Sequence, residues 1–489
     1  MIHKPTNMNV CFITSECYPL VKVGGLGDVS GSLPVALSEL GCHVKLFLPL
    51  YKIINKSAHK LKKIQELDKI PLRLNNCEYI FNIWYKKLKD FLVEVYLIDC
   101  PEFFDRDAVY TNDPDEDLRF IFFQNAVLLT LQKLQWHADV IHCNDWQSAL
   151  IPAILQKQFA WDEMFAKTKT LLSIHNIAYQ GSFPKETFSR TGLHFLHDED
   201  KAPFELYDRF NFLKAGILFA DMITTVSPTY ALETQTGEFG CGLESVLFQK
   251  KDKYSGILNG IDTQIWNPTK DKEILTNYNF DSIERKKINK IRLLKELNLA
   301  FDENKILIGN ISRLAYQKGY DIIIPALDDL MKLNIQLIIL GEGEKQYEEK
   351  LREYSEKYPD KLYIYIGYNN RLSHLITAGS DMFLMPSRYE PCGLNQMYSL
   401  NYGTIPIVRK TGGLADTVRD VNEYPGEANG ITFNDYTSEA LLDAVQRGIK
   451  LFSDKELKTE IVKNGMLGDF SWKNSAGKYL EIYKRLSEL

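Results

Sequence analysis

The sequence has few of the features that mark secreted, membrane-bound or metal-binding proteins. It has only 8 cysteines among 489 residues and no Cys-x-x-Cys pair, which favours reduced thiols over disulfides or a zinc site. No apolar run approaches the roughly 18 to 20 residues that a membrane span requires. The short polar segment 1–9 shows no targeting signal. We therefore expect a cytoplasmic protein without a membrane partner.

Positive charge and internal repetition are also missing. The formal net charge is −6, so we expect no nucleic-acid partner, and an anionic ligand would need locally placed bases. No internal repeat and no low-complexity tract are visible. The basic segment 284–295 is interpreted as the solvated face of a helix. The chain is long enough, and with 45% hydrophobic residues apolar enough, to bury two cores.

Short β-branched runs alternate with longer amphipathic segments along the chain, which is typical of βα units on parallel sheets. This pattern predicts an α/β fold with two domains and a boundary near residue 250. The predicted strands are 10–14, 43–49, 93–99, 140–143, 170–175 and 222–227 in the first half, and 306–311, 336–340, 362–366, 381–385 and 404–408 in the second.

Two glycine-rich turns follow predicted strands, one in each half. The first is Lys22-Val23-Gly24-Gly25-Leu26-Gly27-Asp28; the second is Glu390-Pro391-Cys392-Gly393-Leu394, closely followed by Thr411-Gly412-Gly413-Leu414. Each opens a segment with helical spacing, so backbone N–H groups at a helix N-terminus are free to bind an anion. In the first of these helices, Pro34 is expected near the first turn or at a kink. A single glycine turn often serves only to bend the backbone, but two in separate α/β halves suggest an enzyme of nucleotide sugars.

Such an enzyme needs cations near the leaving group. A departing nucleoside diphosphate gains negative charge, which nearby positive groups stabilise. Arg313 and Lys318 follow a predicted strand, in a loop where ligand contacts concentrate, although their spacing alone fits a pair of solvated cations equally well. Glu390, next to Pro391, has the chemistry either to accept hydrogen bonds from sugar hydroxyls or to cap the following helix.

Six motifs, in order along nearly the whole chain, resemble the bacterial glycogen synthase and plant starch synthase family: 22–29, 142–146, 173–181, 258–262, 312–319 and 386–394. The resemblance implies a GT-B arrangement of two Rossmann-like domains facing each other across a cleft. It implies transfer of glucose from ADP-glucose to the non-reducing-end 4-hydroxyl of an α-1,4-glucan, with retention of configuration and with no metal or other cofactor. It further implies an acceptor-side domain at 1–250, a donor-binding domain at 251–470, and a final helix at 471–489 that crosses back to the first domain.

The resemblance also assigns roles to single residues. It places Glu390 and His175 at the donor sugar, Arg313 and Lys318 at the diphosphate, and Asp145 at the acceptor. The implied nucleotide and donor contacts are Lys22, Gly24, Gly25, Asp28, Asn259, Tyr368 (stacked on adenine), Cys392, Gly393, Leu394 and Asn395.

Two positions depart from the family's usual pattern, and a third differs from related retaining transferases. Asn144 stands where a His is usual, and Asn395 where a Thr is common. Tyr398, eight positions after Glu390, occupies a place where many related retaining transferases carry a second Glu. Without that carboxylate a double displacement is disfavoured. Front-side attack, with the departing phosphate accepting the acceptor's proton, is favoured instead.

Other functions stay open as alternatives. A retaining transferase of the sucrose or trehalose type, using UDP-glucose, is the nearest of them. An NAD-dependent oxidoreductase is disfavoured, because the Gly-x-Gly-x-x-Gly spacing is absent and Pro49-Leu50 stands where an acidic residue is expected. A glucan-binding protein without catalysis is disfavoured by the presence of Lys22, Arg313, Lys318 and Glu390.

Overall fold

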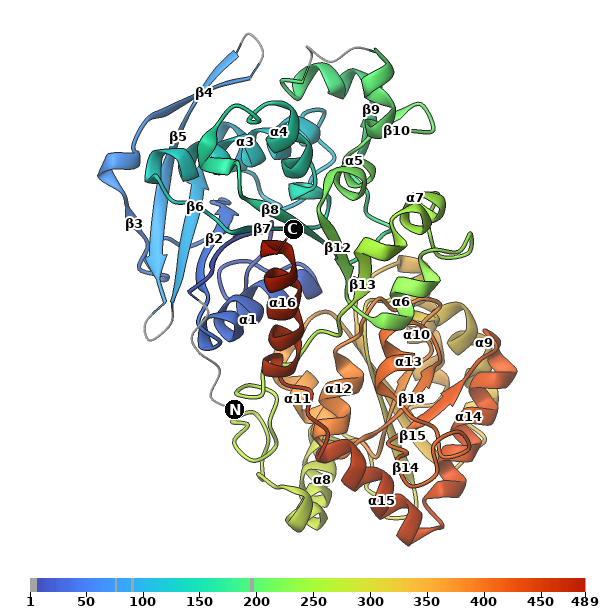
Figure 1. The fold of residues 1–489 in the computed structure, drawn as a ribbon. Coiled ribbons are helices and arrows are strands. Elements are labelled where there is room, and N and C mark those ends of the chain that lie inside the picture. Colours follow the sequence, from blue (N-terminus) through green and yellow to red (C-terminus); the bar gives the residue numbers. More distant parts are fainter. Residues whose placement is uncertain (1–6, 75–76, 89–91, 194–197, 489) are drawn as a thin grey trace. The chain divides into compact units, whose positions relative to one another are not determined.

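The computed structural model describes residues 7–74, 77–88, 92–193 and 198–488. Part of segment 1–9, in which no targeting signal is expected, lies outside these residues. The chain divides into two compact units, Met1–Ile257 with Trp472–Leu489 (unit 1) and Leu258–Ser471 (unit 2). The boundary predicted at residue 250 falls just before a short strand, Tyr254–Gly256, that belongs to unit 1. Figure 1 shows the elements of each unit.

Unit 1 is built on a ten-stranded sheet, counted over the described residues, with strand order β13-β12-β8-β7-β1-β2-β6-β5-β3 and β4 paired to β5. The strands from β13 to β6 are parallel, and β5 adds antiparallel to β6. A separate small sheet holds β9 to β11. The strands of unit 1 are β1 Asn9–Ile13, β2 His43–Pro49, β3 Lys62–Lys63, β4 Ile70–Leu74, β5 Cys77–Lys87, β6 Val93–Asp99, β7 Val140–Asn144, β8 Lys169–Ile174, β9 Ser182–Pro184, β10 Glu205–Leu206, β11 Arg209–Asn211, β12 Met222–Thr225 and β13 Tyr254–Gly256.

Helices surround this sheet, so its central parallel strands are near-continuous apolar runs. The predicted strands 43–49 and 93–99 match β2 and β6 residue for residue. The last helix, α16, packs against α1, β7 and β8 within unit 1. The helices of unit 1 are α1 Gly25–Glu39, α2 Pro101–Phe104, α3 Glu116–Leu134, α4 Ile151–Lys157, α5 Phe212–Phe219, α6 Pro228–Glu233, α7 Glu244–Gln249 and α16 Trp472–Ser487.

Helix α1 corrects one of the two expectations for Pro34. This residue lies well inside the helix, not near its first turn. Because proline has no N–H, the carbonyl of Ser30 one turn earlier loses its helical donor. The thiol of Cys17 lies 3.4 Å from that carbonyl oxygen and donates to it. A side chain outside the helix thus takes over one of its backbone acceptors.

Unit 2 is built on a six-stranded parallel sheet, counted over the described residues, with order β16-β15-β14-β17-β18-β19. Its strands are β14 Ile306–Ile311, β15 Ile335–Gly341, β16 Leu362–Ile366, β17 Met382–Met385, β18 Ile405–Arg409 and β19 Ile431–Phe433. Its helices are α8 Lys286–Glu296, α9 Tyr320–Leu330, α10 Lys345–Lys357, α11 Asn370–Gly379, α12 Asn395–Asn401, α13 Gly412–Thr417, α14 Ser438–Leu451 and α15 Lys455–Met466.

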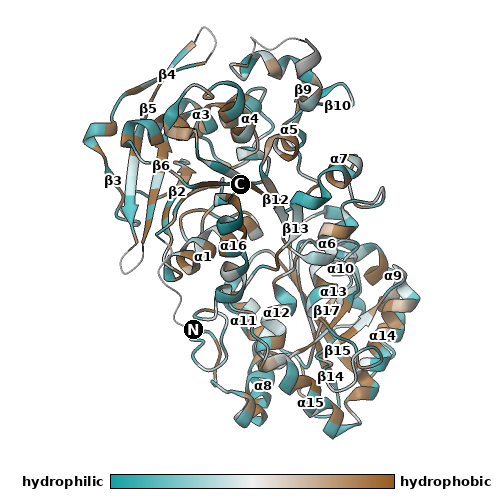
Figure 2. Cartoon of the chain, in the orientation of Figure 1, coloured by the Kyte–Doolittle hydropathy of each residue, from teal (hydrophilic) through white to brown (hydrophobic). Residues whose placement is uncertain are grey.

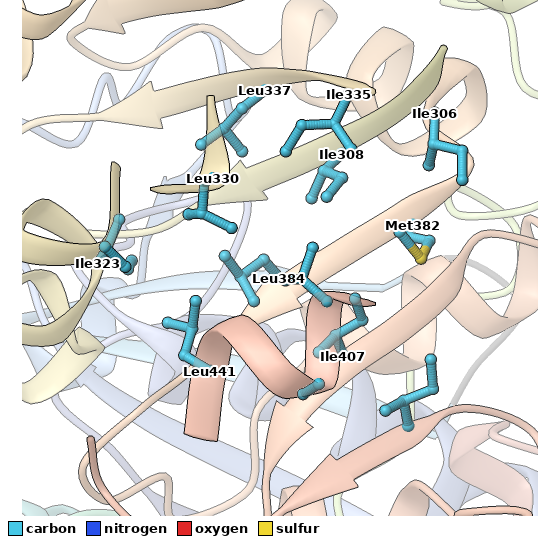
Figure 3. Close-up of a cluster of buried hydrophobic side chains, with 14 of the residues drawn as sticks. Ile306, Ile308, Ile323, Leu330, Ile335, Leu337, Met382, Leu384, Ile407 and Leu441 are labelled. Atoms are coloured by element: carbon cyan, nitrogen blue, oxygen red, sulfur yellow. The ribbon is translucent and has the colours of Figure 1, made fainter. Parts of the chain in front are cut away.

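One face of this sheet packs against α9 and α14. In Figure 3 the side chains of Ile308, Leu337 and Leu384 on the strands point toward Leu330 and Leu441 on the helices. Figure 2 shows the matching hydropathy pattern, with hydrophobic residues along the strands and hydrophilic residues on the outer sides of the helices. This core holds the strand ends, and therefore the loops that follow them, in place.

Helix α8 corrects part of the interpretation of segment 284–295 as a solvated face, although four of its six basic residues are exposed. Lys286 turns inward, where its Nζ donates to the carbonyl of Ala378 at 2.7 Å and to Thr404 Oγ1 at 2.6 Å. Lys290 is also buried, and its Nζ lies 2.6 Å from Asp381 Oδ2. Two of the basic side chains therefore fasten α8 to the ends of neighbouring elements, while Lys287 stays exposed.

Candidate functional site

In unit 2, the loops after β14 and β17 bring together a carboxylate and an ammonium group. Glu390 follows β17 and is buried. Its Oε2 lies 2.6 Å from Lys318 Nζ and accepts a hydrogen bond of 3.0 Å from Ser387 Oγ. Arg313, at the end of β14, is exposed and donates to Gln317 Oε1 at 2.9 Å. Of the three unit 2 residues with implied catalytic roles, Lys318 and Glu390 are thus in direct contact.

The glycines of the following turn hold the Glu390 loop in place. A Cβ added at Gly412 would lie 2.0 Å from the carbonyl oxygen of Glu390, and one at Gly413 would lie 2.1 Å from that of Cys392. The N–H of Gly413 donates to the Glu390 carbonyl at 3.1 Å. We interpreted this turn as an anion site from the sequence. The structure shows instead that its glycines permit a close backbone approach, and that the Gly413 amide is already bonded to the chain.

The remaining donor-side residues in unit 2 lie around the same loop. Gly393, with φ of +71°, and Leu394 precede the short helix α12. Asn395 Nδ2 donates to the carbonyl of Ile311 at 2.7 Å, which occupies one of the two hydrogens of this amide group. Burial raises the pKa of Cys392 to about 12, which keeps it a neutral thiol.

Two further residues with implied donor contacts are placed differently from each other. Asn259 is buried, and its Oδ1 has no hydrogen-bond partner among the described residues. Tyr368 is 76% exposed, so its ring face is open for stacking.

Tyr398 stacks on Trp266 with ring centroids 4.0 Å apart. The position where related transferases carry a second Glu therefore serves packing here.

In unit 1, the first glycine-rich turn is bonded to a carboxylate of the chain itself. Glu16 Oε2 accepts hydrogen bonds from the N–H groups of Val23 at 2.6 Å and Gly24 at 2.8 Å, and Tyr110 Oη donates to Glu16 Oε1 at 2.7 Å. Glu16 was not predicted from the sequence, where its signal was an acidic residue just beyond a buried strand. Of the two glycine amides expected at a diphosphate, that of Gly24 is therefore occupied.

The space beside the two glycines Gly24 and Gly25 of this turn is open. A Cβ added at Gly24 or Gly25 would meet no atom of the described residues within 4 Å. Gly25 begins α1, where the first N–H groups of a helix lack helical partners, although that of Gly27 donates to the Gly24 carbonyl at 3.2 Å. Lys22 Nζ and Asp28 Oδ1 are paired with each other at 2.7 Å, although the resemblance implied separate contacts for them.

Asp145 and His175 follow the neighbouring strands β7 and β8, at the carboxyl edge of the sheet where ligands bind in α/β folds. Asp145 Oδ1 accepts the backbone N–H of His175 at 2.7 Å. Asp145 has φ of +55°, a conformation that costs roughly 1–3 kcal/mol and is concentrated at functional sites. The structure thus brings these two residues into contact. Glu16 follows β1, the strand beside β7, and is bonded to the glycine turn.

Burial sets the charge of both residues. It raises the pKa of Asp145 to about 7, with a further upward contribution from the charge of Glu16 and an opposing one from backbone N–H groups. Burial lowers the pKa of His175 to about 4, so its imidazole is neutral near pH 7. Asp145 is therefore able to exchange a proton near neutral pH, whereas His175 is a neutral hydrogen-bonding group.

Two properties of the described residues bear on other classes of site. No group of three His, Cys, Asp or Glu side chains in this part of the chain is placed to hold a metal ion. No helix there is both long enough and apolar enough to cross a membrane.

Comparison with known proteins decides the family. Residues 9–249 match the family model "Starch synthase catalytic domain", and residues 295–467 match "Glycosyl transferases group 1". The chain is 40% identical to the glycogen synthase of Syntrophotalea carbinolica, with 99% of each chain covered, and 43% identical to that of Pseudothermotoga lettingae, with 98% of each covered. The chain belongs to the glycogen synthase and starch synthase family.

Two solved structures agree with this assignment at different levels. The catalytic domain of starch synthase IV from Arabidopsis thaliana, bound to ADP and acarbose, superposes with a TM-score of 0.91 at 33% identity, covering 99% of this chain and 100% of that one. A sucrose-phosphate synthase from Thermosynechococcus elongatus, at 17% identity and a TM-score of 0.61, shares the fold. The predicted family and GT-B fold class are confirmed: this family member is a glycosyltransferase of the glycogen and starch synthase type.

Proposed function

We propose that this chain transfers glucose from ADP-glucose to the non-reducing-end 4-hydroxyl of an α-1,4-glucan, with retention of configuration. The contact between Lys318 and Glu390 is the observation that carries this proposal. A sugar diphosphate offers hydroxyl donors to a carboxylate and phosphate oxygens to an ammonium group. The full-length likeness to glycogen synthases, and a structural neighbour that binds ADP and acarbose, support the choice of donor and acceptor.

The chemistry follows from these groups. The bond between the anomeric carbon and the phosphate oxygen breaks, and its electron pair leaves with ADP. Lys318 and Arg313 stabilise the charge that develops on the diphosphate, while Glu390 holds the sugar by its hydroxyls. The acceptor's 4-oxygen forms the new bond on the same face, and its proton passes to the departing phosphate. Tyr398 is not a carboxylate, which disfavours a covalent glycosyl-enzyme at that position.

Unit 1 supplies the groups assigned to the acceptor and to the donor sugar. Asp145 and His175 lie at the carboxyl edge of its sheet, beside the glycine turn at 22–28. We assign Asp145 to an acceptor hydroxyl and His175 to a hydroxyl of the transferred glucose. In the same proposal, Gly25 and the start of α1 lie at the diphosphate, Tyr368 at the adenine, and Asn259 at the nucleotide. A cytoplasmic location stays a prediction.

A donor comparison tests the proposal. Purified protein is incubated with maltohexaose and either ADP-glucose or UDP-glucose, with and without EDTA, and the products are separated by length. We expect longer chains with ADP-glucose in both conditions, and complete digestion of the added residues by β-amylase, which cleaves only α-1,4 links. Equal or faster transfer from UDP-glucose would replace the proposed donor, and no elongation from either donor would contradict the proposed reaction.

A further inference from the structure

Asn144, the last residue of β7, is oriented by its own hydrogen bonds. It is fully buried, and its Nδ2 donates to the backbone carbonyl of Ile13 at 3.0 Å. A carbonyl only accepts, so the amide nitrogen faces Ile13 and the amide oxygen faces away. That oxygen, Oδ1, lies 2.9 Å from Nε2 of His175. Because Oδ1 only accepts, the hydrogen must be on Nε2.

The second ring nitrogen of His175, Nδ1, then carries no hydrogen, and its lone pair has no donor in the described part of the chain. Nδ1 is buried and has no hydrogen-bond partner among the described residues. The backbone of His175 is fixed by its bond to Asp145, so the ring is held at both ends. A buried acceptor left unpaired costs about 1–3 kcal/mol, a cost that binding of a donor group would remove.

The titratable groups near His175 do not compete with Asn144 for a hydrogen bond to the His175 ring. His142, two residues before Asn144, bonds through Nδ1 to Tyr483 Oη and through Nε2 to Ser173 Oγ, both at 2.7 Å. Asp145 meets the backbone of His175, not its ring, and Glu16 is bonded to Tyr110 and the glycine turn. Of these titratable groups, none is bonded to the His175 ring.

We propose that Asn144 is a positioning residue that fixes the tautomer of His175, so that Nδ1 accepts a hydrogen bond from a substrate hydroxyl. The identity of that substrate as a sugar rests on the proposed function, but the tautomer does not. The amide also explains what an Asn provides where the family usually has a His. It has no charge to gain or lose, so Nδ1 stays an acceptor at every pH at which His175 is neutral.

Nitrogen NMR of the protein with ¹⁵N-labelled histidine tests the tautomer directly. The His175 signals are assigned by their loss in His175→Gln. We expect a pyrrole-type Nε2 and a pyridine-type Nδ1 in the natural protein, and a mixture of both tautomers in Asn144→Leu. Gln336→Leu is the matched control, because Gln336 is also a buried amide that donates to two carbonyls, in unit 2. It should lower thermal stability without changing the His175 signals.

Activity against pH separates positioning from a structural role. Asn144→Leu should lower kcat about tenfold or more at every pH, since a hydrogen bond of about 1–3 kcal/mol is lost. Asn144→Asp keeps an acceptor oxygen but adds a negative charge that favours the doubly protonated ring. Its activity should therefore be lost at acid pH and recover as the pH rises.

Several results would overturn the proposal. A pyrrole-type Nδ1 in the natural protein would do so, as would unchanged His175 signals in Asn144→Leu. If that variant fails to fold, the spectrum of the natural protein and the pH profile of Asn144→Asp still decide. The expected tautomer in a protein that elongates no glucan would contradict the proposed function and leave the positioning role intact.

Discussion

The two glycine-rich turns look alike in sequence, and their glycines have opposite surroundings in the structure. At Gly24 and Gly25 an added Cβ would meet no described atom within 4 Å, whereas at Gly412 and Gly413 it would strike backbone about 2 Å away. The second pair is required by packing, because it lets α13 lie against the Glu390 loop. Packing within unit 1 does not require the first pair. A molecule that approaches the turn must therefore account for these two glycines.

Gly413→Ala should have the largest effect, because it closes that tight approach. The new Cβ would lie 2.1 Å from the Cys392 carbonyl oxygen, and we expect a loss of about 3 kcal/mol or more in the free energy of unfolding, together with the activity. Urea unfolding measures it. Gly477→Ala, where an added Cβ meets nothing within 4 Å inside α16, is the control and should stabilise by about 0.5–1 kcal/mol. Equal stability of both variants would remove the contrast.

Glu390→Gln asks whether the second turn exists to place this carboxylate. The amide keeps the shape and one oxygen acceptor but loses the charge beside Lys318. We expect kcat to fall by about 10²–10³, with a change in melting temperature of only a few degrees. Glu427→Gln removes a carboxylate from an exposed ion pair with Arg419 and should leave the rate unchanged. A Glu390→Gln enzyme that kept a tenth of its rate would not need this carboxylate.

Gly25→Ala probes the first turn. Alanine fits the start of a helix, so stability should stay within about 1 kcal/mol of the natural protein. A methyl group over the first amides of α1 would keep a phosphate oxygen away from them, and we expect kcat/KM for ADP-glucose to fall about 10- to 100-fold. Steady-state kinetics at fixed maltohexaose measures this. Unchanged kcat/KM would show that no diphosphate comes near this turn.

Asp145→Asn should change how stability depends on pH, by a small increment at each pH step. The Asp145 pKa rises on folding from 3.8 to about 7, so the folded state binds more protons in this range and stability falls as pH rises. The His175 pKa falls from 6.5 to about 4, so the unfolded state binds more protons and stability increases with pH. In the natural protein these trends oppose each other.

With Asn at position 145, only the rising trend remains. The stability of the variant relative to the natural protein should increase by roughly 1 kcal/mol per pH unit between pH 4 and 7. Chemical unfolding at a series of pH values measures the difference, from which the shared contributions of other groups cancel. A difference that stays flat over this range would mean that Asp145 titrates normally in the folded protein.

Much of the fold was readable from the sequence because buried parallel strands are continuous apolar runs. For the same reason, the contact of Asp145 with His175 follows once β7 and β8 are known to be neighbours. Strand β5 was not predicted, because its apolar residues alternate with polar ones at the margin of the sheet. The inward turn of Lys286 was missed, because its acceptors come from residues about 90 to 120 positions away.

Glu16 was missed for a related physical reason. Its role depends on a loop folding back so that the Val23 and Gly24 amides reach its carboxylate, and no local pattern encodes that return. The family resemblance identified the glycine turn, but not which of its amides the chain itself would occupy. The role of a charged residue after a strand is therefore the part of the site that needs coordinates.

The edge of the larger sheet affects how the protein should behave at high concentration. Two short strands pair with β5 beyond β6: β3, which is two lysines long with Lys63 tied to Asp68 at 2.5 Å, and β4, which contains Pro71. An edge divided between a two-residue strand of lysines and a strand with a proline, which has no N–H to donate, offers another copy little to extend. Crowded molecules of this protein should thus resist joining sheet to sheet along that border.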